Sequence, residues 1–158
     1  MPRPKLMLEA IQPDQFIANA HVECETEVQL AQIAAKQAGD ALIREIAVRA
    51  IEDYEKAGLD IVRIAARRKL PVPDSLDEEH RRVIEEMSEK SGRDFDAAYA
   101  TRIRDNQPKA IILFQRGQRI KDPEISALAS RALSMIESWA RKTSLLFEEK
   151  DESEPRSA

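Results

Sequence analysis

The chain has 158 residues, a length typical of one domain with its own core. Apolar residues make up 42%, which excludes a wholly disordered chain, and the 4% of aromatic residues and 4 glycines argue against a β-sheet protein. The net charge is −4, from 25 basic and 29 acidic residues of interspersed sign, so nucleic-acid binding is not expected. Helix-forming residues dominate, and we expect an all-α fold.

The first residues of the chain predict an irregular lead followed by a long helix. Residues 1–13 show no helical pattern, and Asp14 is a candidate N-cap. The helix is expected over 14–37, because apolar residues recur there at helical spacing: Phe16, Ile17, Ala20, Cys24, Val28, Ala31 and Ala35.

A second long helix is predicted directly after the first. Gly39 supplies a helix stop and Asp40 an N-cap, so this amphipathic helix is expected over 41–69. The segment Leu70-Pro71-Val72-Pro73-Asp74 then breaks the chain, because two closely spaced prolines favour an extended backbone. We interpret this segment as the crossover between two helical hairpins.

The segment after the crossover predicts a short helix and then a long one. Asp74 or Ser75 is expected to cap the short helix over 76–90, and Asp94 to cap the long helix that follows. Pro108 lies inside the long helix, where it removes a backbone hydrogen bond. The sequence therefore predicts either a kink at this proline or two separate helices that meet there.

The last helix has the strongest start signal in the chain. Asp122 is a good cap and Pro123 suits the first helical position, so we expect a helix over 123–147. The polar, acidic residues 148–158 are expected to form a disordered tail. The predicted domain, residues 14–147, is an antiparallel four-helix bundle with one extra short helix after the crossover.

Several motifs occur in an order that is similar to that of a known family. They are Phe16, Glu27-Val28-Gln29-Leu30-Ala31, Asp53-Tyr54, Leu70-Pro71-Val72-Pro73, Gly92-Arg93-Asp94-Phe95-Asp96-Ala97-Ala98-Tyr99 and Lys109-Ala110-Ile111-Ile112-Leu113-Phe114. This pattern resembles a family of ferritin-like bacterial domains of unknown function, often exported to the periplasm or the cell surface. The Gly-x-x-Phe-Asp-x-x-Tyr signature at residues 92–99 is its most specific part. The resemblance implies a ferritin-like bundle.

Members of that family often carry histidines at three helix positions, which correspond here to Tyr54, Gln107 and Trp139. The resemblance therefore supports the fold and weakens a metal-binding function. The residues agree, because a di-iron bundle needs Glu-x-x-His motifs and the chain has none. The only histidines are His21 and His80, and we expect no metal site and no cofactor.

Glu27 lies beside the apolar stripe of the first helix, where an unpaired carboxylate is costly. The favoured interpretation is a buried glutamate that is paired with Tyr54 or Arg102. The alternative is a polar pocket at the centre of the bundle that binds a small ligand. Its candidate lining residues are Glu27, Asp53, Tyr54, Gln107 and Trp139.

The sequence contains no nucleophile motif and no phosphate-binding loop, so no enzyme is expected. The favoured hypothesis is a non-catalytic domain that acts through protein contacts. The alternative is a small-ligand or metal-binding protein in stress or redox handling. A homodimer is also a hypothesis, with Leu6, Met7, Leu8 and Ile11 as its contact surface.

The N-terminus and the single cysteine bear on the location of the protein. The charged start, Met1-Pro2-Arg3-Pro4-Lys5, is not followed by the apolar stretch of a signal peptide, and no stretch is long enough to span a membrane. Cys24 cannot form an intrachain disulfide, because it is the only cysteine. As written, the sequence predicts a cytoplasmic protein, or a periplasmic one if its N-terminus has been trimmed.

Overall fold

The computed structural model describes residues 10–153, with side chains described for residues 10–148. This part of the chain is all-helical and contains no β-strand. It holds five helices: α2 (Pro13–Gln37), α3 (Ala41–Arg68), α4 (Glu78–Ser88), α5 (Gly92–Gln118) and α6 (Pro123–Ser153).

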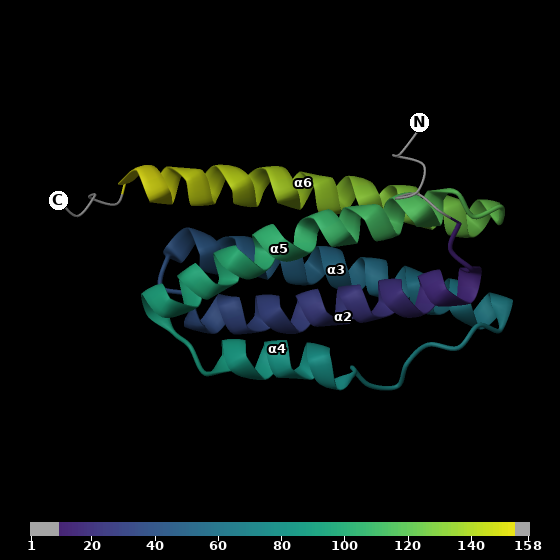
Figure 1. Ribbon diagram of the computed structural model, residues 1–158, viewed down its shortest axis with the longest axis horizontal. Coiled ribbons are helices and arrows are strands. Elements are labelled where there is room, and N and C mark those ends of the chain that lie inside the picture. The colour runs from purple at the N-terminus through teal and green to yellow at the C-terminus, as the bar shows by residue number, and fades with distance from the viewer. Residues whose placement is uncertain (1–9, 154–158) are drawn as a thin grey trace, which may run out of the picture.

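The long helices lie side by side along the molecule, and the short α4 lies along one edge (Figure 1). Helix α2 packs against α3 and α5, and α6 packs against α5 and α3, while α4 contacts α2 and α5. Successive helices run in opposite directions along the long axis (Figure 1). Helix α4 and its two flanking loops therefore carry the chain back along the bundle between α3 and α5.

Three helix starts differ from those predicted. Helix α2 begins at Pro13 after the N-cap Gln12, so Asp14 lies in the first turn and is not the cap. Proline suits this position because its φ is already helical and it has no N–H to satisfy. Helix α4 is capped by Asp77, which accepts from the backbone N–H of His80 at 2.9 Å. Its cap is neither of the two residues proposed from the sequence.

The prediction that Asp94 caps α5 is also wrong, because Ser91 is the N-cap and the helix begins at Gly92. Pro108 lies inside α5, which is a single helix over Gly92–Gln118, so the alternative of two separate helices is wrong. Pro108 is exposed, as are Arg104 and Asp105 in the preceding turn. Water can therefore reach the backbone carbonyl that the proline leaves without a donor, which lowers the cost of keeping the helix continuous.

The start of α6 is as predicted, with Asp122 as the cap and Pro123 in the first position. The Asp122 carboxylate accepts from the backbone N–H of Glu124 at 3.0 Å and from that of Ile125 at 3.4 Å. The helix continues to Ser153, beyond the expected end at residue 147. Residues 148–153 of the expected tail are therefore helical, and residues 154–158 lie outside the described residues.

Close contacts between helices build the apolar core. The rings of Phe16 and Phe114 meet edge to face, with centroids 5.6 Å apart. Gly117 makes room for them, because a Cβ at this position would lie 2.4 Å from Cε1 of Phe16. Ile11, one of the residues proposed for a dimer surface, is buried in this core at 6% exposure. Leu6, Met7 and Leu8 lie outside the described residues.

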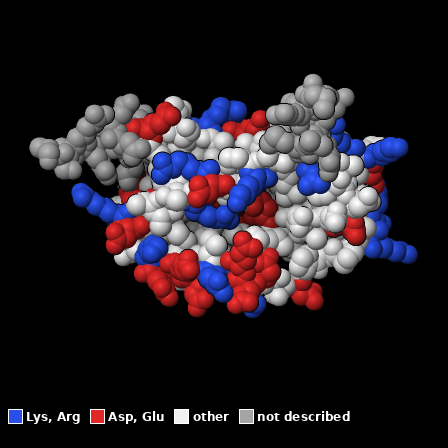
Figure 2. Space-filling view, in the orientation of Figure 1, with Lys and Arg blue, Asp and Glu red and all other residues white. Residues whose placement is uncertain are grey.

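Charged residues of both signs cover the face seen in Figure 2, and acidic side chains gather along its lower edge, where Figure 1 places α4. This mixture is the solvated helical surface that the sequence predicted. None of the described helices combines the length and the apolar composition that a membrane crossing requires.

Candidate functional site

Two carboxylates on α2 face the interior of the bundle. Glu23 and Glu27 are one helical turn apart and therefore lie on the same side of the helix. Glu23 is 7% exposed, and the side chain of Glu27 is 13% exposed. From α5, Asn106 Nδ2 donates to Glu23 Oε1 at 2.9 Å and to Glu27 Oε1 at 3.4 Å. One amide group thus links both glutamates.

Arg102 is the cation that faces these glutamates. Its Nη2 atom lies 3.6 Å from Glu27 Oε1, which confirms one of the two pairings expected from the sequence. The Tyr54 hydroxyl, the other expected partner, makes no hydrogen bond to Glu27. The Nε and Nη2 atoms of Arg102 are buried and have no hydrogen-bond partner among the described residues. Two carboxylates therefore share one guanidinium and one amide.

Burial determines how this cluster ionises. Desolvation raises the pKa of Glu27 to about 8, and the Glu23 charge adds to this effect while Arg102 opposes it. Desolvation also raises the pKa of Glu23, against the opposing effects of Arg102, Asn106 and His80. Two adjacent buried negative charges would be costly with a single cation nearby. We therefore expect the pair to hold a proton at neutral pH.

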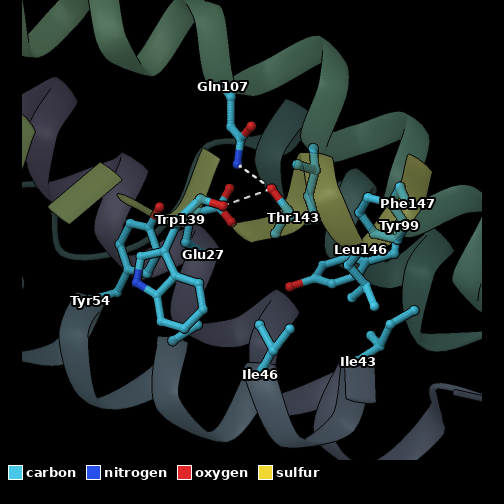
Figure 3. A pocket seen from close by; sticks show the side chains of 12 residues that line it. Glu27, Ile43, Ile46, Tyr54, Tyr99, Gln107, Trp139, Thr143, Leu146 and Phe147 are labelled. Atoms are coloured by element: carbon cyan, nitrogen blue, oxygen red, sulfur yellow. Dashed lines mark hydrogen bonds between the residues drawn. The ribbon is translucent and has the colours of Figure 1, made fainter. Parts of the chain in front are cut away.

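A small cavity of about 30 Å³ lies beside Glu27 (Figure 3). This volume is close to that of one water molecule, so the cavity as it stands is too small for an organic ligand. Its lining residues come from α2, α3, α5 and α6: Glu27, Ile43, Ile46, Ala50, Tyr54, Tyr99, Ile103, Gln107, Trp139, Thr143, Leu146 and Phe147. Four of the five residues proposed from the sequence thus lie around one cavity.

The fifth proposed residue, Asp53, is exposed and does not line this cavity. Adjacent residues of a helix point about 100° apart, and this rotation turns Asp53 away from the interior that Tyr54 faces. Asp53 instead accepts a hydrogen bond from Trp139 Nε1 at 2.9 Å. On the other side of the cavity, Gln107 Nε2 donates to Thr143 Oγ1 at 3.1 Å (Figure 3). The side chains of Trp139 and Gln107 therefore connect helices.

Several polar residues of this site were not predicted from the sequence. Glu23 and Asn106 are two of them, although Glu23 lies four residues before Glu27 and this spacing places both on one helix face. Tyr99 was recognised only as part of the signature, and its ring stacks on Phe95 with centroids 5.3 Å apart. Thr143 was not proposed as a lining residue. Its partner Gln107 lies on a different helix, and no local pattern shows such a contact.

The two histidines lie on different helices, His21 on α2 and His80 on α4. Within the part of the chain that the structure describes, no group of three or more His, Cys, Asp and Glu side chains is arranged to hold a metal ion. His80 Nδ1 lies 2.8 Å from the carboxylate of Asp77, the cap of its own helix. His21 lies on α2 and lines a groove between α2 and α3.

The signature at residues 92–99 joins the start of α5 to the α2–α3 turn at one end of the bundle. Gly92 has a positive φ of 58°. A Cβ on Gly39 would lie 2.9 Å from the backbone of Gly92, so the α2–α3 turn leaves no room for a side chain at residue 39. Phe95 is fully buried, and Asp96 accepts hydrogen bonds from the backbone of the α2–α3 turn. Each fixed position of the signature thus has a structural role in this chain.

The described residues form an all-helical domain with a polar centre, and the signature at residues 92–99 stabilises its fold. A family model described as "Domain of unknown function (DUF4142)" matches residues 3–144. The match covers most of the chain, and the chain belongs to this family. No curated protein and no solved structure matches the chain.

Proposed function

We propose that the protein is a non-catalytic helical-bundle domain that acts through protein contacts. In this proposal, the four long helices form an antiparallel bundle of the ferritin-like kind, and α4 with its loops is the crossover. The alternating directions of the helices and the position of α4 on the edge support this arrangement (Figure 1).

An exposed apolar stripe on α3 is the observation that carries the proposed function. Val48, Leu59 and Val62 are 53%, 57% and 39% exposed. Leu59 and Val62 follow Val48 at 11 and 14 residues, which are close to whole numbers of turns at about 3.6 residues per turn. The three side chains therefore lie on one side of α3, and Leu59 and Val62, which are one turn apart, form an exposed apolar surface of the kind that protein contacts use.

The centre of the bundle supports the same proposal. Tyr54 and Trp139 are buried at 7% and 4% exposure, and they fill positions where the resemblance implies histidines. The indole of Trp139 and the amide of Gln107 are hydrogen-bonded to other helices. These side chains contribute packing and cross-helix hydrogen bonds, which is what a stable scaffold for contacts requires.

Site-specific photo-crosslinking in the cells that produce the protein would test this function. A photoreactive amino acid would replace Leu59 in one variant and Leu145 in a matched control. Leu145 is a suitable control because it is 63% exposed but lies on α6. We expect a discrete adduct with one protein from position 59 only, and we expect Val62→Glu to abolish it.

Elemental analysis of the protein, purified without a metal-affinity resin, completes the test. The proposal predicts less than about 0.1 equivalent of iron, manganese, copper or zinc. Stoichiometric metal, or equal crosslinking from positions 59 and 145, would refute the contact function and favour metal binding or non-specific association.

A further inference from the structure

A groove of about 370 Å³ lies between α2 and α3. Tyr54 lines both this groove and the central cavity. Its volume falls within the usual range of small-molecule sites. The lining residues are His21, Cys24, Glu25, Val28, Gln32, Tyr54, Glu55, Gly58 and Leu59.

The missing side chain of Gly58 opens this groove. A Cβ at Gly58 would lie 3.7 Å from Cβ of Cys24, which is an ordinary contact distance. The helix backbone therefore does not require glycine here for close packing, and φ is not positive at this residue. Cys24 and Val28 on α2 and Leu59 on α3 give the groove an apolar surface.

The two charged residues of the lining are both carboxylates. Glu25 lines the groove from α2 and Glu55 from α3, and the lining contains no lysine or arginine. Glu25 accepts a hydrogen bond from the neutral amide of Gln29 at 2.8 Å. Burial raises the pKa of the Cys24 thiol, and the neighbouring glutamates Glu23, Glu27 and Glu25 add to this effect. A cation would be attracted here, and an anion would be repelled.

One buried polar atom of the groove has no hydrogen-bond partner among the described residues. This atom is Nδ1 of His21 on α2. Buried polar groups are normally hydrogen-bonded, so the unpaired nitrogen indicates that the groove receives a polar ligand.

We propose that this groove binds a primary alkylammonium group. The ammonium has three N–H donors and no acceptor, which matches the carboxylates of Glu25 and Glu55 and the unpaired Nδ1 of neutral His21, which accepts when the ring proton is on Nε2. The alkyl chain lies along Cys24, Val28 and Leu59. Such a group belongs either to a free polyamine or to a lysine side chain of another protein.

The test is a titration of the full ¹⁵N-labelled chain with 1-butylammonium chloride, followed by nuclear magnetic resonance. We expect saturable shifts of the backbone amides of Cys24, Gly58 and Leu59. The neutral isostere 1-butanol serves as the control and is expected to bind at least about tenfold more weakly, because it lacks charge-assisted hydrogen bonds. Equal binding of both compounds, or no saturable shift with the amine, would overturn the proposal.

Variants identify the groups responsible. The double variant Glu25→Gln/Glu55→Gln should weaken butylammonium binding at least about tenfold, since it removes both ionic acceptors. The matched control, Glu45→Gln/Glu52→Gln, removes two exposed carboxylates of α3 that do not line the groove and should bind as the parent does. An unchanged affinity in the first double variant would also overturn the proposal.

Two further ligands distinguish the sources of the ammonium group. Tighter binding of spermidine than of Nα-acetyl-lysine methylamide indicates a free polyamine as the natural ligand, and the reverse order indicates a lysine side chain. Gly58→Leu, which fills the groove, should abolish binding of both ligands while the far-ultraviolet circular dichroism of the helices is retained. Retained binding in a folded Gly58→Leu variant would contradict the placement of the site.

Discussion

The carboxylate of Asp96 on α5 accepts a hydrogen bond from the backbone N–H of Gly39, in the turn between α2 and α3, at 2.9 Å. Its second oxygen accepts from the N–H of Asp40 at 3.0 Å. Asp40 in turn caps α3 through the N–H groups of Leu42 and Ile43. A side chain of the α5–α6 hairpin thus holds the turn of the α2–α3 hairpin.

Replacing Asp96 should therefore destabilise the whole bundle. Asp96→Ala removes two charge-assisted hydrogen bonds, and we expect it to lower the free energy of unfolding by about 1–3 kcal/mol. Urea denaturation followed by circular dichroism measures this loss. The control is Asp94→Ala, because Asp94 is an exposed acid in the same turn of α5. A loss in the control as large as that for Asp96 would show that the contact to the turn is not responsible.

Two glycine substitutions should have opposite effects on stability. In Gly39→Ala, the new Cβ would lie 2.9 Å from the backbone of Gly92, so the two turns must move apart and the protein is destabilised. In Gly58→Ala, the nearest atom is 3.7 Å away, and alanine in a helix interior should stabilise by about 0.5–1 kcal/mol. Thermal unfolding of both variants measures the two effects. A stabilised Gly39→Ala variant would contradict the close approach of the two turns.

The stability of the protein should decrease as the pH rises from about 4.5 to about 8. The pKa of Glu27 rises on folding from 4.5 to about 8, so the folded protein binds a proton that the unfolded chain releases. The stabilisation from this proton is complete below about pH 4.5 and is lost as the pH rises through about 8. Urea midpoints measured at pH 6 and pH 9 should show a lower midpoint at the higher pH.

Glu27→Gln should reduce this dependence on pH, because glutamine keeps the shape of the protonated acid and cannot ionise. Glu25→Gln is the matched control, since Glu25 lies on the same helix but outside the buried pair. A variant at position 27 that loses as much stability between pH 6 and pH 9 as the parent protein would show that another group causes the effect.

Asp122 should make the protein sensitive to strong acid. It accepts from Arg68 Nε at 2.6 Å and also caps α6, and the hydrogen bond from Arg68 is the largest of the effects that lower its pKa from 3.8 to about 2. Its stabilising contribution is present above about pH 3.8 and is lost as the pH falls through about 2. Asp122→Asn keeps a capping oxygen but loses the ion pair, so its Tm should fall less than that of Asp122→Ala. Equal losses would show that the cap contributes nothing.

Local rules predicted much of the fold from the sequence. Asp40 and Asp122 cap their helices as expected, because a cap acts on N–H groups only two or three residues away. The predicted cap of α5, Asp94, was wrong. Ser91 and Asp94 are both common capping residues, and which of them caps the helix depends on Gly92. The backbone of Gly92 must meet the turn at Gly39, and that contact is not local.

The candidate site was predicted less completely than the helices. Helical spacing placed Glu27 and Tyr54 near the interior, and the structure brings them to one cavity. The same spacing could not give the volume of that cavity, which depends on how Trp139 and Tyr99 pack across helices. The groove beside Gly58 was also missed, because it arises from an absent side chain between two helices.

The two helical hairpins are joined by polar contacts at both ends of the bundle. Asp96 binds the α2–α3 turn at one end, and the Arg68–Asp122 ion pair joins α3 to α6 at the other (Figure 1). Loss of one contact leaves the other in place, so the hairpins should open like a hinge about the intact end. Native-state hydrogen exchange of Asp96→Ala should then show faster exchange that decreases along each helix with distance from residue 96, and not a uniform increase over the chain.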